Sequence, residues 1–168
     1  MFFYPLLLIF IVFSSLCVTY GKEKHLVFIN KIITFNLLFI PAAIRYGIGA
    51  DYYEYVTIFN HYVSKGVHDG HTEIAYWWLN RIVYMLGGEV QWVFAIMAFL
   101  TLFFIFVEIE KNDWIVYAPI TMIIVYSWMY TEIRQVLAMS MIFASIKYWN
   151  KKKEKNKCTI IYSEFLFS

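Results

Sequence analysis

The chain has 168 residues, of which 61% are hydrophobic and 21% aromatic, and its formal net charge is +2. Soluble domains contain about 45–50% apolar residues, so this composition indicates a membrane protein. Its lysines gather in a C-terminal run and form no basic stripe of the kind that binds nucleic acid, so we expect no nucleic-acid partner.

Five apolar segments are long enough to cross a bilayer as helices, which requires about 17–25 residues. They are residues 2–20, 26–44, 90–107, 114–130 and 133–149. We interpret the first as a retained helix rather than a signal peptide, because no basic region precedes it and Thr19-Tyr20-Gly21 is a poor cleavage site. The predicted fold is all-α: a polytopic membrane helix bundle over residues 1–150, with about five transmembrane helices.

The lysines predict the orientation of this bundle. Ten of the eleven lysines lie on one side if there are five spans, and Lys65 alone lies on the other. Because positive residues favour the cytoplasmic side, the N-terminus is expected outside and the lysine-rich tail, residues 151–168, inside. The long loop over residues 45–89 is then on the outer side.

The outer loop begins with the charged, glycine-broken sequence RYGIGADYYEY. Gly47 and Gly49 permit backbone angles that other residues avoid. Asp51 and Glu54 resemble a capping box, which predicts a helix starting at Asp51. Its apolar-aromatic face has helical spacing, which favours an amphipathic helix on the outer leaflet. That face consists of Tyr52, Tyr55, Val56, Phe59, Tyr62 and Val63.

A second helix is predicted in the loop at residues 74–86. It is short and contains Arg81, so we interpret it as interfacial or re-entrant, with the Trp77-Trp78 pair at headgroup depth. Glu73 precedes it and could serve its N-terminus.

Neither the cysteines nor the histidines predict a metal or redox site. Cys17 and Cys158 lie far apart and have no partner at metal or redox spacing, so both are expected to be free thiols. His61, His68 and His71 are spaced by seven and three residues, unlike the i, i+4 pair of a helical zinc motif. We therefore predict no metal and no cofactor.

All three arginines, Arg45, Arg81 and Arg134, fall on the outer side, which the positive-inside rule does not predict. Arginine suits bidentate contacts to phosphate, so the pattern suggests an anionic ligand at the outer surface. The turn at residues 131–135 brings Arg134 back to this face, where it can approach Arg45 and Asp51. Such a group could hold a pyrophosphate and take a proton from an attacking hydroxyl.

Each of these residues also has a purely structural interpretation. The arginines can anchor separately to lipid headgroups. Asp51 can serve only as a helix cap, and the two glycines can serve only to make a turn. The tyrosines can form an interface belt.

The chain resembles the EpsG-like family of bacterial exopolysaccharide and capsule clusters, which is similar to the Wzy-type polymerases. The resemblance covers about residues 40–153. It is carried by RYGIGADYYEY, by EIAYWWLNRIVYMLGG and by EIRQVLAMSMIFASIKYW with its following lysines. The most specific positions are Arg45, Gly47, Gly49, Asp51 and Tyr52 in the first motif, and Arg134-Gln135 in the last.

The resemblance implies a polymerase that joins polyprenyl-pyrophosphate-linked oligosaccharide units on the outer face of the bacterial cytoplasmic membrane. It implies Arg45 and Arg134 as contacts of the pyrophosphate and Asp51 as base or loop organiser. The implied substrate-binding residues are Arg81, Tyr52, Tyr55, Gln135 and Glu73. The bilayer and other polysaccharide-assembly proteins are the remaining expected partners.

Members of this family are usually about twice this long, so the chain is expected to be an N-terminal fragment, from a frameshift or an early stop. Two other functions are considered. One is a non-catalytic membrane subunit of a polysaccharide assembly or export complex. The other is a small transporter, which the absence of internal repeats in the sequence disfavours.

Overall fold

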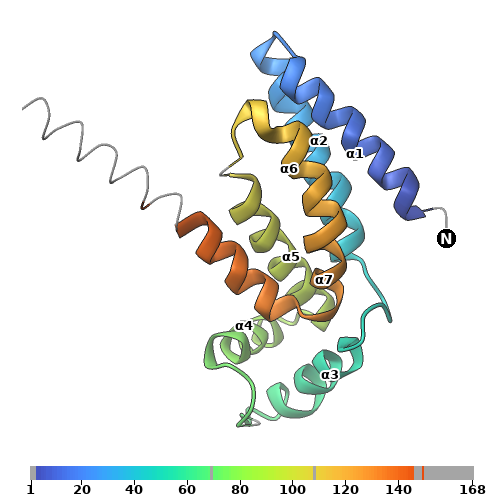
Figure 1. Ribbon diagram of the computed structural model, residues 1–168. Coiled ribbons are helices and arrows are strands. Elements are labelled where there is room, and N and C mark those ends of the chain that lie inside the picture. The colour runs from blue at the N-terminus through green and yellow to red at the C-terminus, as the bar shows by residue number, and fades with distance from the viewer. Residues whose placement is uncertain (1–2, 69, 108, 146–148, 150–168) are drawn as a thin grey trace, which may run out of the picture.

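The computed structural model describes residues 3–68, 70–107, 109–145 and 149, and the regular structure in these ranges is helical (Figure 1). The elements in chain order are α1 Phe3–Tyr20, α2 Lys24–Ala43, α3 Tyr52–Thr57, η1 Ile58–Val63, α4 Ile74–Met85, α5 Val90–Phe106, η2 Lys111–Asp113, α6 Trp114–Ile120, η3 Thr121–Val125 and α7 Tyr126–Thr131. A last helix covers Ile133–Ser145. The predicted all-α class is confirmed. The tail with Cys158, and residues 146–148 of the fifth predicted span, lie outside the described residues.

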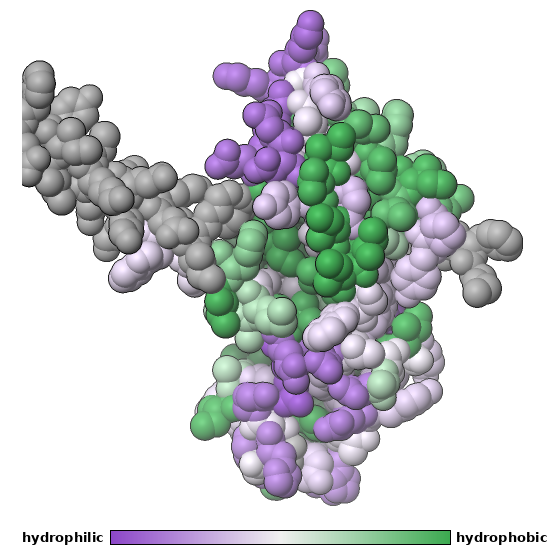
Figure 2. Space-filling model, in the orientation of Figure 1, coloured by the Kyte–Doolittle hydropathy of each residue, from purple (hydrophilic) through white to green (hydrophobic). Residues whose placement is uncertain are grey.

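Two helical runs are long and apolar enough to cross a membrane: α2 and the continuous run Lys111–Thr131. Tyr4–Tyr20, Val90–Phe106 and Ile133–Ser145 are shorter apolar helices. Figure 2 shows a hydrophobic band between hydrophilic surfaces above and below it. Exposed apolar side chains such as Phe13 of α1 and Phe28 of α2 belong to this surface, which a bilayer would cover. The number of spans stays a prediction.

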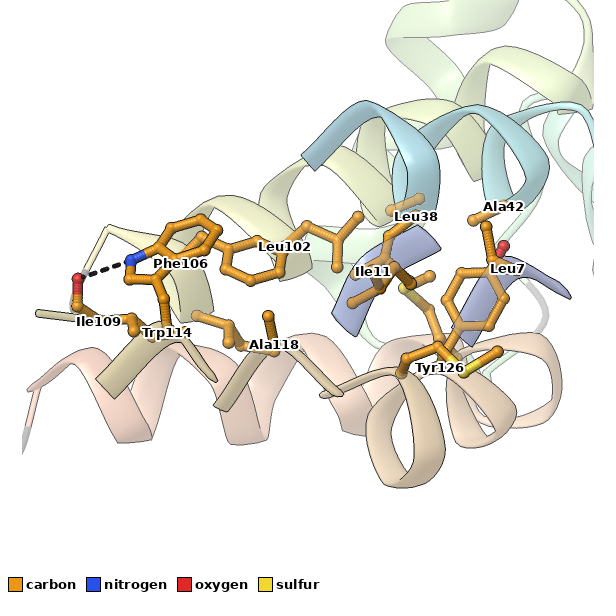
Figure 3. Close-up of a cluster of buried hydrophobic side chains, with 14 of the residues drawn as sticks. Leu7, Ile11, Leu38, Ala42, Leu102, Phe106, Ile109, Trp114, Ala118 and Tyr126 are labelled. Atoms are coloured by element: carbon orange, nitrogen blue, oxygen red, sulfur yellow. Dashed lines mark hydrogen bonds between the residues drawn. The ribbon is translucent and has the colours of Figure 1, made fainter. Parts of the chain in front are cut away.

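The bundle core forms where α1 packs against α2 and α6, and α2 against α5 (Figure 3). Polar groups inside it find partners within the protein, as an apolar environment requires. Ser14 Oγ lies 2.7 Å from Thr34 Oγ1 across α1 and α2. The Trp114 indole donates to the carbonyl of Ile109 at 3.2 Å.

The two ends of the bundle carry different cations. At one end the Lys111 ammonium donates to the carbonyl of Gly21, so the two lysine-bearing turns meet there. At the other end Arg45 contacts the last turn of α7. The turn after α1 and the turn before α6 therefore lie at one end and Arg45 at the other, while the side of the membrane on which each end lies stays a prediction.

The arginine end is covered by α3, η1 and α4, which we call the cap. It has its own buried cluster, built with α5. The predicted face of residues 52–63 is apolar, but it packs on protein: Tyr55 is 2% exposed and Val63 is fully buried. Its partners are α4 and α5, so the predicted contact of this face with the outer leaflet is wrong. Ile58, which the α-helical pattern left out, is also buried, because a π-helix begins there and changes the winding.

The α4 helix has 12 residues, about 18 Å at 1.5 Å per residue. That is too short for a hydrocarbon core of about 30 Å. Its Trp77 indole donates to the carbonyl of Val67 at 3.0 Å, while Trp78 is 54% exposed. Trp77 thus helps to close the cap, and Trp78 alone is available at the surface.

Candidate functional site

Arg45 follows α2 and is buried, with 3% of its surface exposed. Its Nη1 donates to the carbonyl oxygens of Met129 at 2.9 Å and Tyr130 at 2.8 Å. These are among the last carbonyls of α7, where a cation is favoured by the helix dipole. The guanidinium also lies over Phe94, with 4.2 Å from Cζ to the ring centroid. Burial lowers its pKa below the ordinary value for arginine.

Two atoms of this guanidinium, Nε and Nη2, have no hydrogen-bond partner in the described part of the chain. An unpaired buried donor is costly, and ordered water commonly satisfies such groups. Arg45 therefore connects the loop after α2 to the end of α7 through a single nitrogen and an aromatic stack.

The loop after Arg45 approaches α7 closely, and this explains its glycines. Gly47 has φ +64° and Gly49 has φ +106°, so both adopt the positive φ values that the sequence predicted. A Cβ on Gly49 would lie 1.8 Å from the Tyr130 carbonyl oxygen. Only glycine lets the loop touch the backbone of Tyr130, the same residue that accepts from Arg45.

Gln91, the second residue of α5, completes this junction. Its Nε2 donates to the carbonyl of Arg45 at 2.9 Å and also to the carbonyl of Ala43. The end of α2 is thus satisfied by a side chain from α5. Sequence reasoning missed Gln91, although a lone amide opening a charge-free apolar segment was the available signal.

Tyr55 and Tyr76 form the centre of the cluster, with ring centroids 5.8 Å apart. Tyr55 packs against Phe94 from one direction, and the Arg134 guanidinium lies 5.7 Å from its ring. Burial raises the pKa of the Tyr55 phenol and, more strongly, that of Tyr76. Both phenols are therefore neutral donors at physiological pH.

Arg134 reaches the same tyrosines from the start of the last helix. Its guanidinium lies 5.6 Å from the Tyr76 ring and forms an ion pair with Glu73. The Arg134 side chain is 27% exposed and the Glu73 side chain 63%. Glu73 occupies the N-cap position of α4 but makes no capping hydrogen bond, so its carboxylate serves Arg134 instead.

Asp51 lies at the N-cap position of α3, as predicted, but its side chain makes no capping hydrogen bond, so the capping box is wrong. Asp51 lies one helical turn before Tyr55, whose backbone N–H donates to the Asp51 carbonyl at 3.1 Å. Arg134 contacts Tyr55 directly, whereas Arg45 reaches it through Phe94, which both side chains contact.

The remaining predicted residues are arranged differently. Tyr52 is 4% exposed and stacks on Phe94, so neither Tyr52 nor Tyr55 offers a free ring face. Arg81 donates to the carbonyl of Val63 at 2.7 Å and so caps η1. Gln135 is exposed beside Arg134.

Sequence reasoning also missed the aromatic residues that pack against the Arg45 guanidinium. Phe94 and Tyr130 had no distinguishing signal, because aromatic residues are common throughout this chain. Tyr46 and Tyr53 are the exposed tyrosines next to Tyr52, at 83% and 69%.

The family comparison now gives this geometry a context. The family model described as EpsG family matches residues 28–162 of the chain, which is most of its length. The chain belongs to the EpsG family. EpsG is a Wzy-like polysaccharide polymerase family, so the protein is a membrane protein of polysaccharide biosynthesis of the polymerase type. The search of curated proteins and the search of solved structures found no match.

Within this EpsG protein, the arginine end of the bundle has a polar, partly open side at Arg134 and a closed side at Arg45. In the described part of the chain no group of three or more histidine, cysteine, aspartate or glutamate side chains is placed to hold a metal.

Proposed function

We propose that this EpsG protein joins polyprenyl-pyrophosphate-linked oligosaccharide repeat units on the outer face of the bacterial cytoplasmic membrane. In this reaction a sugar hydroxyl of one unit attacks the anomeric carbon of another. The new glycosidic bond forms while the bond to the pyrophosphate breaks, and the pyrophosphate leaves on its lipid. The proton of the attacking hydroxyl passes to a carboxylate.

The observation that carries the proposal is the partly exposed Arg134 beside two neutral phenols and a carboxylate. Negative charge develops on the leaving pyrophosphate, and a fixed cationic donor such as Arg134 would stabilise it. Arg134 is accessible and suits bidentate contact with phosphate oxygens. In this proposal Arg134 binds the pyrophosphate, and Gln135 is a neighbouring hydrogen-bond donor.

Arg45 takes a positioning role in this proposal, because its guanidinium is buried against carbonyls and rings. It holds the loop carrying Asp51 against α7, and Asp51 is the candidate proton acceptor. The exposed rings of Tyr46 and Tyr53, rather than those of Tyr52 and Tyr55, are available to stack on sugars. Arg81 holds the cap together.

Polymer length in cells tests the function. Arg134→Gln and Asp51→Asn should abolish lengthening while the amount of protein in the membrane stays at the wild-type level. Lys65→Gln, on an exposed residue between η1 and α4, is the control and should leave polymer length unchanged. Normal polymer from both site variants would instead favour the non-catalytic membrane subunit.

A further inference from the structure

A groove runs along the last helix and ends at Arg134. Its volume is about 520 Å³, within the range of small-molecule sites. Polar residues gather at the end where Glu73, Arg134 and Gln135 lie. The other side chains that line it are mainly apolar: Leu79, Met97, Leu100, Leu137, Ala138 and Met141.

A second groove flanks the same helix and shows what is particular to the first. It has a volume of about 290 Å³ and is lined by residues such as Ile105, Ile124 and Phe143. No charged side chain lines this second groove. An apolar chain could enter either one, but only the first offers a cation at its end.

We propose that the groove ending at Arg134 holds the first part of the isoprenoid chain of the lipid pyrophosphate, with the pyrophosphate at Arg134. This inference rests on the proposed function and locates its lipid. In a lipid pyrophosphate, the pyrophosphate is attached directly to a single isoprenoid chain. This matches a single groove that ends at a single arginine. A phospholipid, in contrast, has two chains joined through glycerol. Met141 is 47% exposed, so the rest of the chain can continue into the bilayer.

Glu73 occupies the anion position in the absence of ligand. In its ion pair with Arg134 the Glu73 side chain is 63% exposed and the Arg134 side chain 27%, and a pair that is open to solvent on one side is weakened by screening. A pyrophosphate carries more charge and can accept both arms of the guanidinium, so it displaces the carboxylate. Removing the competing charge with Glu73→Gln should tighten binding about two- to fivefold.

Photolabelling tests the groove directly. The full-length protein in nanodiscs is labelled with a diazirine-bearing farnesyl pyrophosphate, and the labelled peptides are mapped by mass spectrometry. Label is expected on residues 97–100 and 137–141. Ala138→Trp should reduce labelling about tenfold by filling the groove, whereas Met139→Trp, on the neighbouring residue that lines the second groove, should not.

The outcomes distinguish the proposal that the groove binds the lipid from the proposal that the protein is a polymerase. Equal labelling of Ala138→Trp and wild type, or displacement of the probe by excess phosphatidylglycerol, would overturn the proposal that this groove holds the isoprenoid chain. Tighter probe binding by Glu73→Gln supports it even if Ala138→Trp does not fold. Labelling as expected, combined with normal polymer from Arg134→Gln, would support the groove and overturn the polymerase function instead.

Discussion

Arg45 and Arg134 both belong to the arginine end of the bundle, but they differ in burial and in the groups that they contact. Arg45 is 3% exposed and donates to backbone carbonyls of α7. The Arg134 side chain is 27% exposed and pairs with Glu73, whose side chain is 63% exposed. A buried cation bonded to backbone stabilises a structure, whereas an accessible cation with an exchangeable partner can bind a ligand. The two arginines therefore divide structure and binding between them.

The sharpest test of the closed side is Gly49→Ala. The added Cβ would overlap the Tyr130 carbonyl in a backbone conformation that disfavours alanine, so the free energy of unfolding should fall by about 3 kcal/mol. Denaturant titration in detergent micelles measures it. Gly47→Ala is the matched control, since it has positive φ but only ordinary contact, and should cost about 1–2 kcal/mol. Equal losses would mean that the loop does not touch α7.

Arg45→Met should have the next largest effect on stability. It keeps an unbranched apolar stem but removes the guanidinium, which leaves the carbonyls of Met129 and Tyr130 without their donor, at a cost of about 2 kcal/mol. The same titration measures it, with Arg45→Lys alongside. Lysine keeps the charge but not the planar stack on Phe94, so it should recover only part of the loss. Wild-type stability of Arg45→Met would contradict the structural role given to Arg45 at the end of α7.

Gln91→Met should lower stability by about 1 kcal/mol, because the carbonyls of Ala43 and Arg45 lose their amide donor. Hydrogen exchange of the backbone should rise near the end of α2 and not at the Lys111 end of the bundle. A uniform rise at both ends would show that Gln91 does not act locally.

Arg134→Gln should change stability least, by less than about 1 kcal/mol, because its ion pair with Glu73 is exposed. Its effect should instead fall on polymer formation, which the same preparation can be assayed for in membranes. A stability loss as large as that of Arg45→Met would make Arg134 a second structural arginine and remove the contrast.

The sequence predicted the helices well because their apolar runs are long and charge-free. It also assigned Gly47, Gly49, Arg45, Asp51 and Arg134 to one region, and the structure places Arg134 against the Tyr55 ring and Asp51 one turn before Tyr55.

The partners of these residues could not be read from the sequence. Whether Arg45 faces solvent or the carbonyls of α7 depends on a contact 84 residues away. Helical spacing correctly gave an apolar face to residues 52–63 but could not distinguish lipid from the side chains of α5. The π-helix at Ile58 also changed which residues are buried.

In the proposed function, Arg134 is open to a pyrophosphate and Arg45 is not. Arginine labelling with phenylglyoxal, mapped by mass spectrometry on the full-length protein in nanodiscs, tests it most directly. We expect phenylglyoxal to label Arg134 when no pyrophosphate is added, and farnesyl pyrophosphate to protect Arg134 from labelling. Arg45 should stay unlabelled with and without the pyrophosphate. Labelling of Arg45 at the rate of Arg134, or no protection of Arg134 by the pyrophosphate, would contradict the account.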